Sequence, residues 1–295
     1  MPPIPHPPVE RARPYLGTFV TIKVAGLAEA EAHLAIDQAF TVVAAIHGLM
    51  SFHEPRSDVS ALNRDAARVP VVVDPRTFEV IRCALEIASA SGGVFDISIA
   101  PQLVVWGFLP RPAGAPEPDR RASWRDIELL SDGRIRFHRP LWIDLGGIAK
   151  GYAVDSAIAS LRSAAVSQCS INAGGDLRIS GPAVERVVLR TAAPDDNVPV
   201  LEIENGSVAS SSRREHIRRF RHRQVGPHVH GLRRAAVGTR SFVSVAAEQC
   251  VIADALTKVV LARGAESASL LRKYDATAYL HSARGGWKIL GRGSE

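Results

Sequence analysis

The chain has little cysteine and no long apolar run, and both absences limit what it can be. Its 295 residues include only three cysteines, Cys83, Cys169 and Cys250. They are scattered, odd in number and without the spacing of a zinc site, so we expect buried thiols in a reducing compartment rather than a disulfide framework. No stretch approaches about 20 apolar residues, and we therefore expect no membrane span.

The N-terminal residues also lack the pattern of a secretory signal, because no apolar run follows a basic start. Together these absences predict a cytoplasmic protein. At 46% hydrophobic and 22% charged residues, the chain has enough apolar material for a large core. We expect residues 1–14 to be a flexible, proline-rich N-terminus and residues 15–295 to form a single domain.

The positive charge of the chain is local. The formal net charge is +6, yet residues 213–240 alone contain nine arginines and one glutamate. The strip Arg213–Arg223 suits phosphate groups or an acidic partner, but a solvated, arginine-rich hairpin has the same composition. No recognition helix, zinc finger or aromatic–basic platform accompanies it, so we do not expect a nucleic-acid ligand.

Helical and strand-like patterns alternate without a regular βαβ rhythm. Alternation predicts a strand over residues 18–24, and apolar residues at three- and four-residue steps predict a helix over 36–50. Asp74 and Pro75 are typical of a helix start, with an apolar stripe from Phe78 through Ile81 and Leu85 to Ala88. We expect a hairpin turn at 132–133, strands near 187–190, 242–246, 277–281 and 287–290, and a helix around 265–273. This order predicts an α+β fold in which antiparallel sheets pack with helices.

The segment 143–155 is the most informative part of the sequence. It predicts a strand end carrying Asp144, a turn at Gly146–Gly147, and a helix with apolar residues from Ala149 to Leu161. Glycines allow a ligand to approach the backbone closely, and a helix N-terminus favours anionic groups. With Lys150 in the first helical turn, the segment suits a phosphorylated ligand, although a tight turn with solvated charges has the same pattern.

Further motifs occur in a fixed order along the chain. They are Leu16–Phe19, Met50–His53 with Ser57–Asn63, Gly93–Pro101, Asp144–Asp155, the turn Gly174–Asp176, and Asp254 near the start of a helix. Each motif is weak when taken singly. In this order they resemble the ApbE-type FAD:protein FMN transferases over nearly the whole chain.

The resemblance implies an ApbE-like, T-fold-related architecture with a cleft for FAD. It also implies Mg²⁺-dependent transfer of FMN from FAD to a Ser or Thr hydroxyl of a target flavoprotein, with release of AMP. By the same resemblance, His228 and Asp254 are catalytic, and the metal site contains Gly147, Asp254 and Thr257. The residues expected to contact FAD are Leu16, His53, Phe95, Asp96, Asp144 and Lys150. Phosphate or metal-bound water would lie at a turn formed by Ser210–Ser212.

The chain departs from the family pattern at two places that bear on the chemistry. Family members usually have a threonine four residues after the metal-binding aspartate, where this chain has Lys258. Lys258 and Asp254 are spaced i, i+4 on a helix and so can form an ion pair, or the ammonium can bind the pyrophosphate. The family's His-x-x-Asp-Pro segment is also changed. His228 is present, but Gly231 and Leu232 stand where the Asp-Pro usually follows.

Three hypotheses about function therefore remain open at the level of sequence. The first is a flavin transferase acting on a partner flavoprotein. The second is an FAD-binding protein or Mg²⁺-dependent FAD pyrophosphatase that has lost transfer to protein. The third is a protein that binds nucleic acid or an acidic partner through the strip Arg213–Arg223.

Overall fold

The computed structural model describes residues 6–189, 198–212, 217–237, 241–282 and 286–292. The α-helices are α1 (Glu29–Met50), α2 (Asp58–Asp65), α3 (Pro75–Ala90), α4 (Ala100–Val105), α5 (Ala149–Ser163), α6 (Cys250–Arg263) and α7 (Ala268–Lys273). The strands are β1 (Val9–Tyr15), β2 (Thr18–Ala25), β3 (Val71–Val72), β4 (Ile127–Leu129), β5 (Arg134–Phe137), β6 (Gln168–Ala173), β7 (Asp176–Ser180), β8 (Glu185–Val188), β9 (Val200–Ile203), β10 (Gly206–Ser212), β11 (Arg218–Phe220), β12 (Arg223–Val225), β13 (Val229–His230), β14 (Ala235–Ala236), β15 (Ser241–Ala247), β16 (Thr277–Ser282) and β17 (Gly286–Gly291). Short 3₁₀ helices cover Ile97–Ile99, Trp124–Asp126 and Gly264–Ser267.

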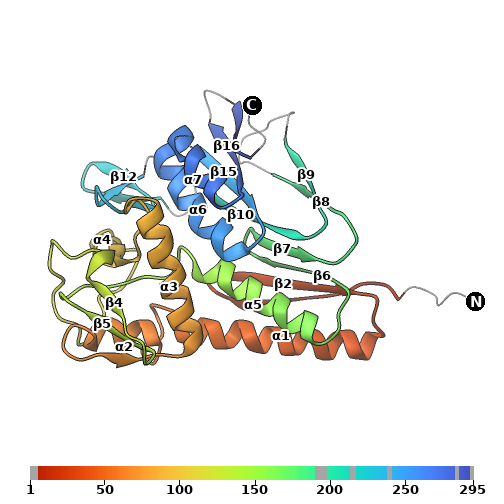
Figure 1. Ribbon diagram of the computed structural model, residues 1–295, viewed down its shortest axis with the longest axis horizontal. Coiled ribbons are helices and arrows are strands. Elements are labelled where there is room, and N and C mark those ends of the chain that lie inside the picture. Colours follow the sequence, from red (N-terminus) through yellow and green to blue (C-terminus); the bar gives the residue numbers. More distant parts are fainter. Residues whose placement is uncertain (1–5, 190–197, 213–216, 238–240, 283–285, 293–295) are drawn as a thin grey trace, which may run out of the picture.

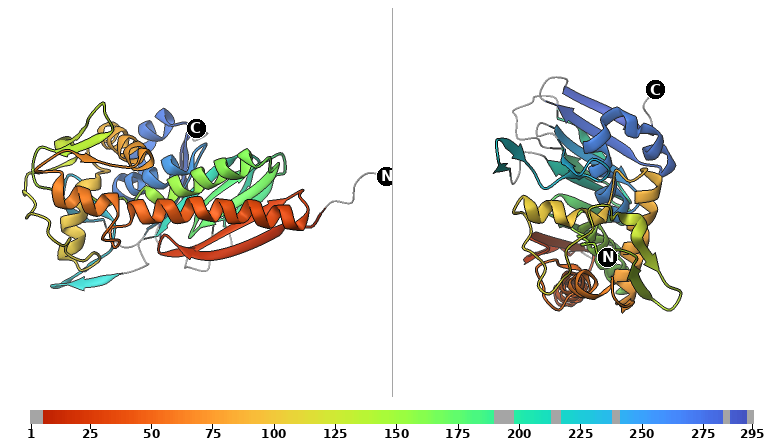
Figure 2. Two further views of the ribbon diagram at one scale, coloured as in Figure 1. Left: turned by 90° about the horizontal axis from the view of Figure 1, so that it is seen from below. Right: turned by 90° about the vertical axis from the view of Figure 1, so that its left-hand side faces the viewer.

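An antiparallel sheet of eight strands is the centre of the fold. Its strand order is β1-β2-β6-β7-β10-β15-β16-β17. Helix α5 packs between α1 and α6, and all three helices pack against this sheet, as Figure 1 shows. In Figure 2, α1 runs along the molecule beside the β1–β2 hairpin. The prediction of an α+β fold built from antiparallel sheets and helices is confirmed.

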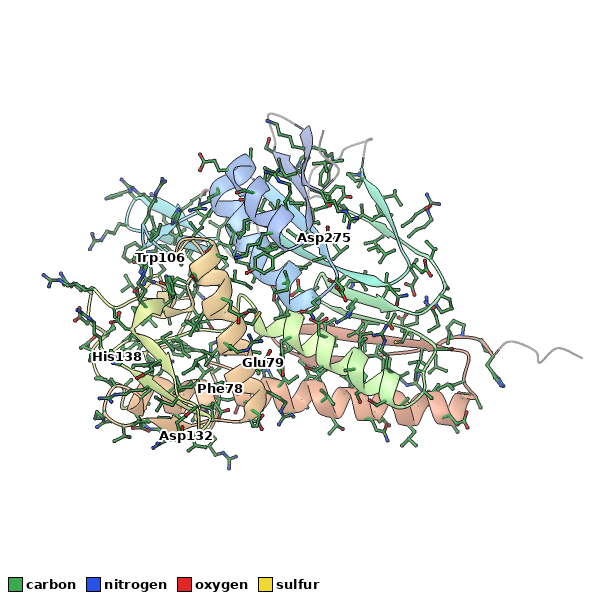
Figure 3. All side chains as sticks on the ribbon, in the orientation of Figure 1. Phe78, Glu79, Trp106, Asp132, His138 and Asp275 are labelled. Atoms are coloured by element: carbon green, nitrogen blue, oxygen red, sulfur yellow. The ribbon has the colours of Figure 1, made fainter. Side chains whose placement is uncertain are left out.

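The segment from α2 to β5 forms a second lobe beside the sheet. Here α2, α3 and α4 accompany the three-stranded sheet β3-β5-β4. In Figure 3, Asp132 marks the hairpin between β4 and β5, and Trp106 marks the end of α4. A core cluster that includes Ile81, Ile135, Ile143 and Leu256 joins this lobe to α6, so the two parts pack as one unit.

Helices α5 and α6 are held together by a carboxylate cap and by a close backbone contact at a glycine. The carboxylate of Asp155 on α5 accepts hydrogen bonds from the N–H groups of Cys250 (3.0 Å) and Val251 (2.9 Å), the first residues of α6. These N–H groups have no partner within their own helix, so the carboxylate caps α6 and complements its dipole. A Cβ at Gly151 would collide with the backbone oxygen of Cys250, so the close crossing of the helices requires glycine there.

Helix α1 is long and rich in apolar residues. It is 22 residues long, and an 18-residue window of it has a mean hydropathy of 1.2, which makes it, among the described residues, a weak candidate for a membrane span. Its residues Ile36, Phe40 and Val43 are buried in a cluster with β2, β6 and α5, whereas Glu31 and Asp37 are exposed. This pattern is that of an amphipathic core helix.

Most of the elements predicted from the sequence are present. The strand at β2, the helix at α1, the hairpin at β4–β5 and the later strands β15, β16 and β17 are confirmed. The predicted strand 187–190 overlaps β8 only at 187–188, and the predicted helix 265–273 is a 3₁₀ turn followed by α7. Arg190, at the end of the predicted strand 187–190, lies outside the described residues. Helix α3 begins as predicted, with Asp74 accepting from Arg76 N–H. Of its predicted stripe, Ile81 and Ala88 are fully buried, whereas Phe78 and Leu85 are only partly so. The buried face is completed by Val80, Ala84 and Ile87.

Three expectations about local structure are wrong. Residues 9–14 are not a flexible terminus, because β1 pairs with β2 throughout this range. Pro14 is compatible with the strand since β1 lies at the edge of the sheet, where a missing N–H is tolerated. The serines of 210–212 belong to β10 rather than to a turn, and they pair with β15.

The third wrong expectation is the strand end before Asp144. Residues 141–145 belong to no strand. Instead, the side chain of Asn63 bonds both backbone groups of Ile143, its Oδ1 accepting from N–H (2.7 Å) and its Nδ2 donating to C=O (3.1 Å). Asp144 N–H donates to Ile97 O at 2.8 Å. The buried backbone is thus satisfied without a neighbouring strand.

Candidate active site

A cavity of about 940 Å³ opens between the eight-stranded sheet and the second lobe. This volume lies in the range that small-molecule sites occupy, roughly 300–1,000 Å³. Eight of the residues predicted to form the site line it: Leu16, His53, Phe95, Asp96, Asp144, Gly147, Lys150 and His228. Asp254 and Thr257 do not line it, and both are fully buried.

Four charged side chains form a cluster at the floor of the cavity, which we call the floor cluster: Lys150 and Lys258, which line the cavity, and Asp176 and Asp254, which are buried beneath them. Lys150 is ion-paired with Asp176 and lies 3.7 Å from Asp254 Oδ2. Lys258 is ion-paired with Asp254 Oδ1, one helical turn earlier on α6. Both carboxylates are fully buried, whereas both lysines reach the cavity. The cluster therefore presents positive charge to a ligand in the cavity, while its negative charge is buried beneath the lysines.

The two carboxylates have different proton affinities. Burial acts to raise the pKa of Asp254, but the Lys150 and Lys258 ammonium groups lower it to about 2. The pKa of Asp176 is raised to about 6, because burial and the negative charge of Asp254 together outweigh the opposing effect of the Lys150 ammonium. The pKa of Lys150 is raised because two carboxylates face it, although burial opposes the shift. Lys150 is consequently cationic at neutral pH.

One buried atom of the floor cluster lacks a partner. Asp176 Oδ1 makes no hydrogen bond among the described residues, while its Oδ2 receives the Lys150 ammonium. An unbonded buried oxygen is costly to a folded protein unless it has a role or binds an unseen group. Sequence reasoning named the turn Gly174–Asp176 but gave Asp176 no role.

The wall of the cavity contains Phe95 and Asp96, which are both buried. Asp96 Oδ1 accepts from the N–H and the hydroxyl of Ser98, each at 2.7 Å. Its Oδ2 accepts from the Arg234 guanidinium at 2.9 Å. Burial raises the pKa of Asp96, and the charge of Arg234 opposes this shift. Asp96 therefore holds the wall together through Arg234, a residue that sequence reasoning did not single out.

The rim carries the remaining predicted FAD contacts. Leu16 and Gly17 join β1 to β2 with φ values of 57° and 73°, which is typical of a type I′ hairpin turn. Leucine is strained at positive φ, and here it lines the cavity. His53 is exposed near Asp144; burial raises the pKa of Asp144, whereas the Gly146 N–H and His53 lower it.

His228 also lines the cavity, next to Ser212 at the end of β10. Its Nε2 is 3.3 Å from Ser212 O, and since a carbonyl only accepts, Nε2 is the donor. With Nε2 as the donor, the neutral ring carries its proton on Nε2. This tautomer is compatible with the predicted role of His228 as a base.

Residues 16–280 match the model of the ApbE family. The chain belongs to this family. A FAD:protein FMN transferase of Treponema pallidum is 27% identical over 181 residues, which is 57% of this chain and 50% of that protein. One of Klebsiella pneumoniae is 30% identical over 150 residues, 48% of each chain. The matches thus span about half of the length of these curated relatives.

Solved structures of ApbE proteins have the same fold. The protein from Thermotoga maritima superposes with a TM-score of 0.84 at 23% identity, with 97% of each chain covered. The apo flavinyl transferase ApbE of Pseudomonas stutzeri gives 0.83 at 18% identity, covering 99% of this chain and 97% of that one.

The residues expected to bind Mg²⁺ do not fit a metal ion in this member of the ApbE family. Mg²⁺ requires near-octahedral oxygen ligands. Asp254 is already bonded to Lys258 and also accepts from Gly151 N–H at 3.2 Å. Thr257 donates to Asp254 O at 2.7 Å and is 2.8 Å from the hydroxyl of Ser211, so it faces the protein interior. Within the described part of the chain, no three His, Cys, Asp or Glu side chains converge as metal ligands.

The arginine strip lies partly at the rim. Arg213 and Arg214 are outside the described residues, and β11 and β12 pair as a short hairpin. Arg218 lines the cavity and stacks over Phe108 at 5.1 Å. Arg219 and Arg223 are exposed. The pattern predicted a hairpin or a binding strip, and the structure contains a hairpin beside the cavity.

Proposed function

We propose that this protein transfers the FMN moiety of FAD to a Ser or Thr hydroxyl of a target flavoprotein and releases AMP. The observation that carries the proposal is the ApbE-type cavity of about 940 Å³ with two lysines, Lys150 and Lys258, at its floor. Phe95 supplies an apolar wall that suits a flavin or adenine ring, since aromatic rings stack. The names of the Treponema and Klebsiella relatives support the same reaction.

The reaction breaks the phosphoanhydride bond of FAD and forms a phosphoester with the target hydroxyl. The target hydroxyl oxygen attacks the phosphorus on the FMN side of the pyrophosphate, and the bond from that phosphorus to the bridging oxygen breaks. AMP leaves with the bridging oxygen, and a base takes the hydroxyl proton. Such a step depends on positioning and on positive charge near the phosphate oxygens.

Different residues neutralise the charge of the pyrophosphate and remove the hydroxyl proton. The ammonium groups of Lys150 and Lys258 offset the negative charge of the pyrophosphate. His228, which lines the cavity, acts as the base that takes the hydroxyl proton. Magnesium dependence, which the family resemblance implies, is left out of the proposal because the Asp254 site does not fit the metal. The free cysteines Cys83, Cys169 and Cys250 support a reducing compartment, such as the cytoplasm, for the reaction.

The test is incubation with FAD and candidate acceptor flavoproteins, followed by mass spectrometry and chromatography. We expect one FMN added to a Ser or Thr of an acceptor, with AMP released in equal amount. A His228→Gln variant should bind FAD normally and lose transfer. If no acceptor is labelled while FAD is bound, the transferase proposal fails.

A second candidate, an FAD pyrophosphatase or FAD-binding protein, is favoured by one observation. A side chain at Gly231, where the family has the aspartate after His228, would collide with Gly93 O and lie 2.8 Å from Asp96 Cβ. The usual aspartate therefore has no room here. Release of free FMN without any acceptor would favour this candidate, whereas an acceptor-dependent product would exclude it.

A further inference from the structure

The residue four positions after Asp254 distinguishes this chain from the pattern of its family. Lys258 and Asp254 lie on the same face of α6 because i and i+4 residues are neighbours on a helix. They form an ion pair, and the lysine side chain is only 16% exposed. The ammonium therefore has a fixed position against the carboxylate.

The ammonium lies where the predicted metal ligands would converge. A Cβ built at Gly147 would be 3.7 Å from Lys258 Cε, so the lysine chain packs over the glycine turn that precedes α5. Asp254 lies at the end of that chain, and the cavity lies beside it. Lys258 thus occupies the space between Gly147 and Asp254.

The neighbouring threonine does not replace the missing ligand. Thr257 is fully buried and donates to Asp254 O, which turns its hydroxyl away from the cavity. Ser211 holds it in this orientation from β10. A metal ion at Asp254 would therefore lack the threonine oxygen and would meet the ammonium of Lys258.

The charges of the floor cluster lead to the same conclusion. Two ammonium groups and two carboxylates cancel, so the cluster needs no further cation to be neutral. A divalent ion placed between Lys150 and Lys258 would be repelled by both. An ammonium has three N–H donors, of which the bond to Asp254 takes one, so Lys258 is able to donate to a phosphate oxygen while it stays paired.

We propose that the Lys258 ammonium takes the place of the divalent metal ion and binds the FAD pyrophosphate directly, so that this chain acts on FAD without Mg²⁺. This inference rests on the proposed function, because it assumes that FAD is the ligand of the cavity. Lys258 is then a phosphate-binding residue, and Asp254 is its counter-ion.

The first experiment measures FAD affinity of the wild-type protein by flavin fluorescence, in EDTA and in Mg²⁺. We expect the two dissociation constants to agree within about twofold. In Lys258→Thr, FAD binding in EDTA should weaken by about tenfold or more, as expected for loss of a charged hydrogen bond, and Mg²⁺ should restore part of it. Lys288→Thr, which removes an exposed lysine from β17, is the matched control and should behave as wild type. Strong Mg²⁺ dependence of wild-type binding would overturn the proposal.

The second experiment uses Mn²⁺ alone and does not depend on FAD. Electron paramagnetic resonance should detect no tight Mn²⁺ site in the wild type and a new one in Lys258→Thr. A tight Mn²⁺ site in the wild type, lost in Asp254→Asn, would overturn the proposal even if FAD bound. If FAD fails to bind under all conditions, the proposed function fails, and the Mn²⁺ comparison still decides whether Lys258 excludes a metal.

Discussion

The chain concentrates positive charge in two regions that differ in burial. In the floor cluster, Lys150 and Lys258 are paired with fully buried carboxylates. In the β11–β12 hairpin, Arg219 and Arg223 extend into solvent. The arginines dominate the net charge, yet the two lysines lie at the cavity floor. The number of charges in a segment is therefore a poor guide to where the chemistry occurs.

The physical difference is the medium around each charge. Solvent and salt screen charges at the surface, with a Debye length of about 8 Å at physiological ionic strength. In the floor cluster, water is largely excluded, so each ammonium acts strongly on its carboxylate and on a bound phosphate. The floor should consequently respond to mutation and to pH, and the rim should respond mainly to salt.

The largest effect is expected at the floor, from Lys150→Met. This change leaves Asp176 and Asp254 buried with only one ammonium, and breaking a buried ion pair typically costs about 3–5 kcal/mol of unfolding free energy. Transfer to an acceptor should also fall by about 10²-fold or more. Urea denaturation and kcat/KM measure the two effects. The double variant with Asp176→Asn should regain most of the stability but not the activity; a Lys150→Met protein as stable as wild type would contradict the importance of the pair.

The next effect concerns the pH dependence of stability, through Asp176. Its pKa is about 6 in the folded protein against 3.8 for the ordinary group, so the folded state binds the proton more tightly. The stability that protonated Asp176 contributes is full below about pH 4 and is lost as the pH rises through 6. Asp254 has the opposite sign, since its pKa of about 2 gives stability that is lost only as the pH falls toward 2.

Asp176→Asn should remove the loss of stability that the wild type shows as the pH rises through 6. Relative to wild type, its unfolding free energy should rise by up to about 3 kcal/mol between pH 4 and pH 7, the value of about two pKa units. Denaturation at several pH values measures the difference. Arg219→Gln serves as the control from the rim and should show a constant difference over the same range, because arginine does not titrate there. A constant difference for Asp176→Asn as well would show that burial does not raise its pKa.

The sequence predicted helices and the hairpin well because their signals are local. Asp74 and Pro75 mark the start of α3, and the apolar residues 149–161 form the buried face of α5. The serines of 210–212 were misassigned because their placement is not local. They are polar, but β15 pairs with their strand, so the sheet determines their conformation.

The site was predicted in part for the same reason. The ordered motifs identified most of the cavity lining, and the i, i+4 spacing identified the Lys258–Asp254 pair. Asp176 and Arg234 were missed because their roles depend on elements far apart in the chain: Lys150 on α5 faces β7, and Arg234 reaches Asp96. Spacing within a segment carries no information about such contacts. The roles assigned from the resemblance stay predictions, both the FAD contacts of Leu16, His53, Phe95, Asp96, Asp144 and Lys150 and the catalytic roles of His228 and Asp254.

A smaller effect on stability is expected from substitution of Asp155. This carboxylate caps α6, which carries Asp254 and Lys258, and it is ion-paired with Arg178. Asp155→Ala should lower the unfolding free energy by about 2 kcal/mol, the value of a strong helix cap. Asp155→Asn retains an acceptor oxygen and should lose about half as much. Thermal denaturation distinguishes these variants, and equal losses in both would assign the effect to the ion pair instead of the cap.

The smallest effect is expected at the rim. Arg219 and Arg223 lie beside the cavity mouth, so we expect them to attract an acidic acceptor protein rather than to act on FAD. Arg219→Gln with Arg223→Gln should leave FAD affinity unchanged and lower kcat/KM for the acceptor by about threefold to tenfold at low salt, through slower association. The defect should disappear as NaCl is raised, because salt screens exposed charges. Arg136 and Arg186, which are exposed on β5 and β8, provide the matched double control. A defect of the rim variant that persists at high salt would show that these arginines contact the acceptor or FAD directly, and the distinction between a buried floor and a screened rim would then fail.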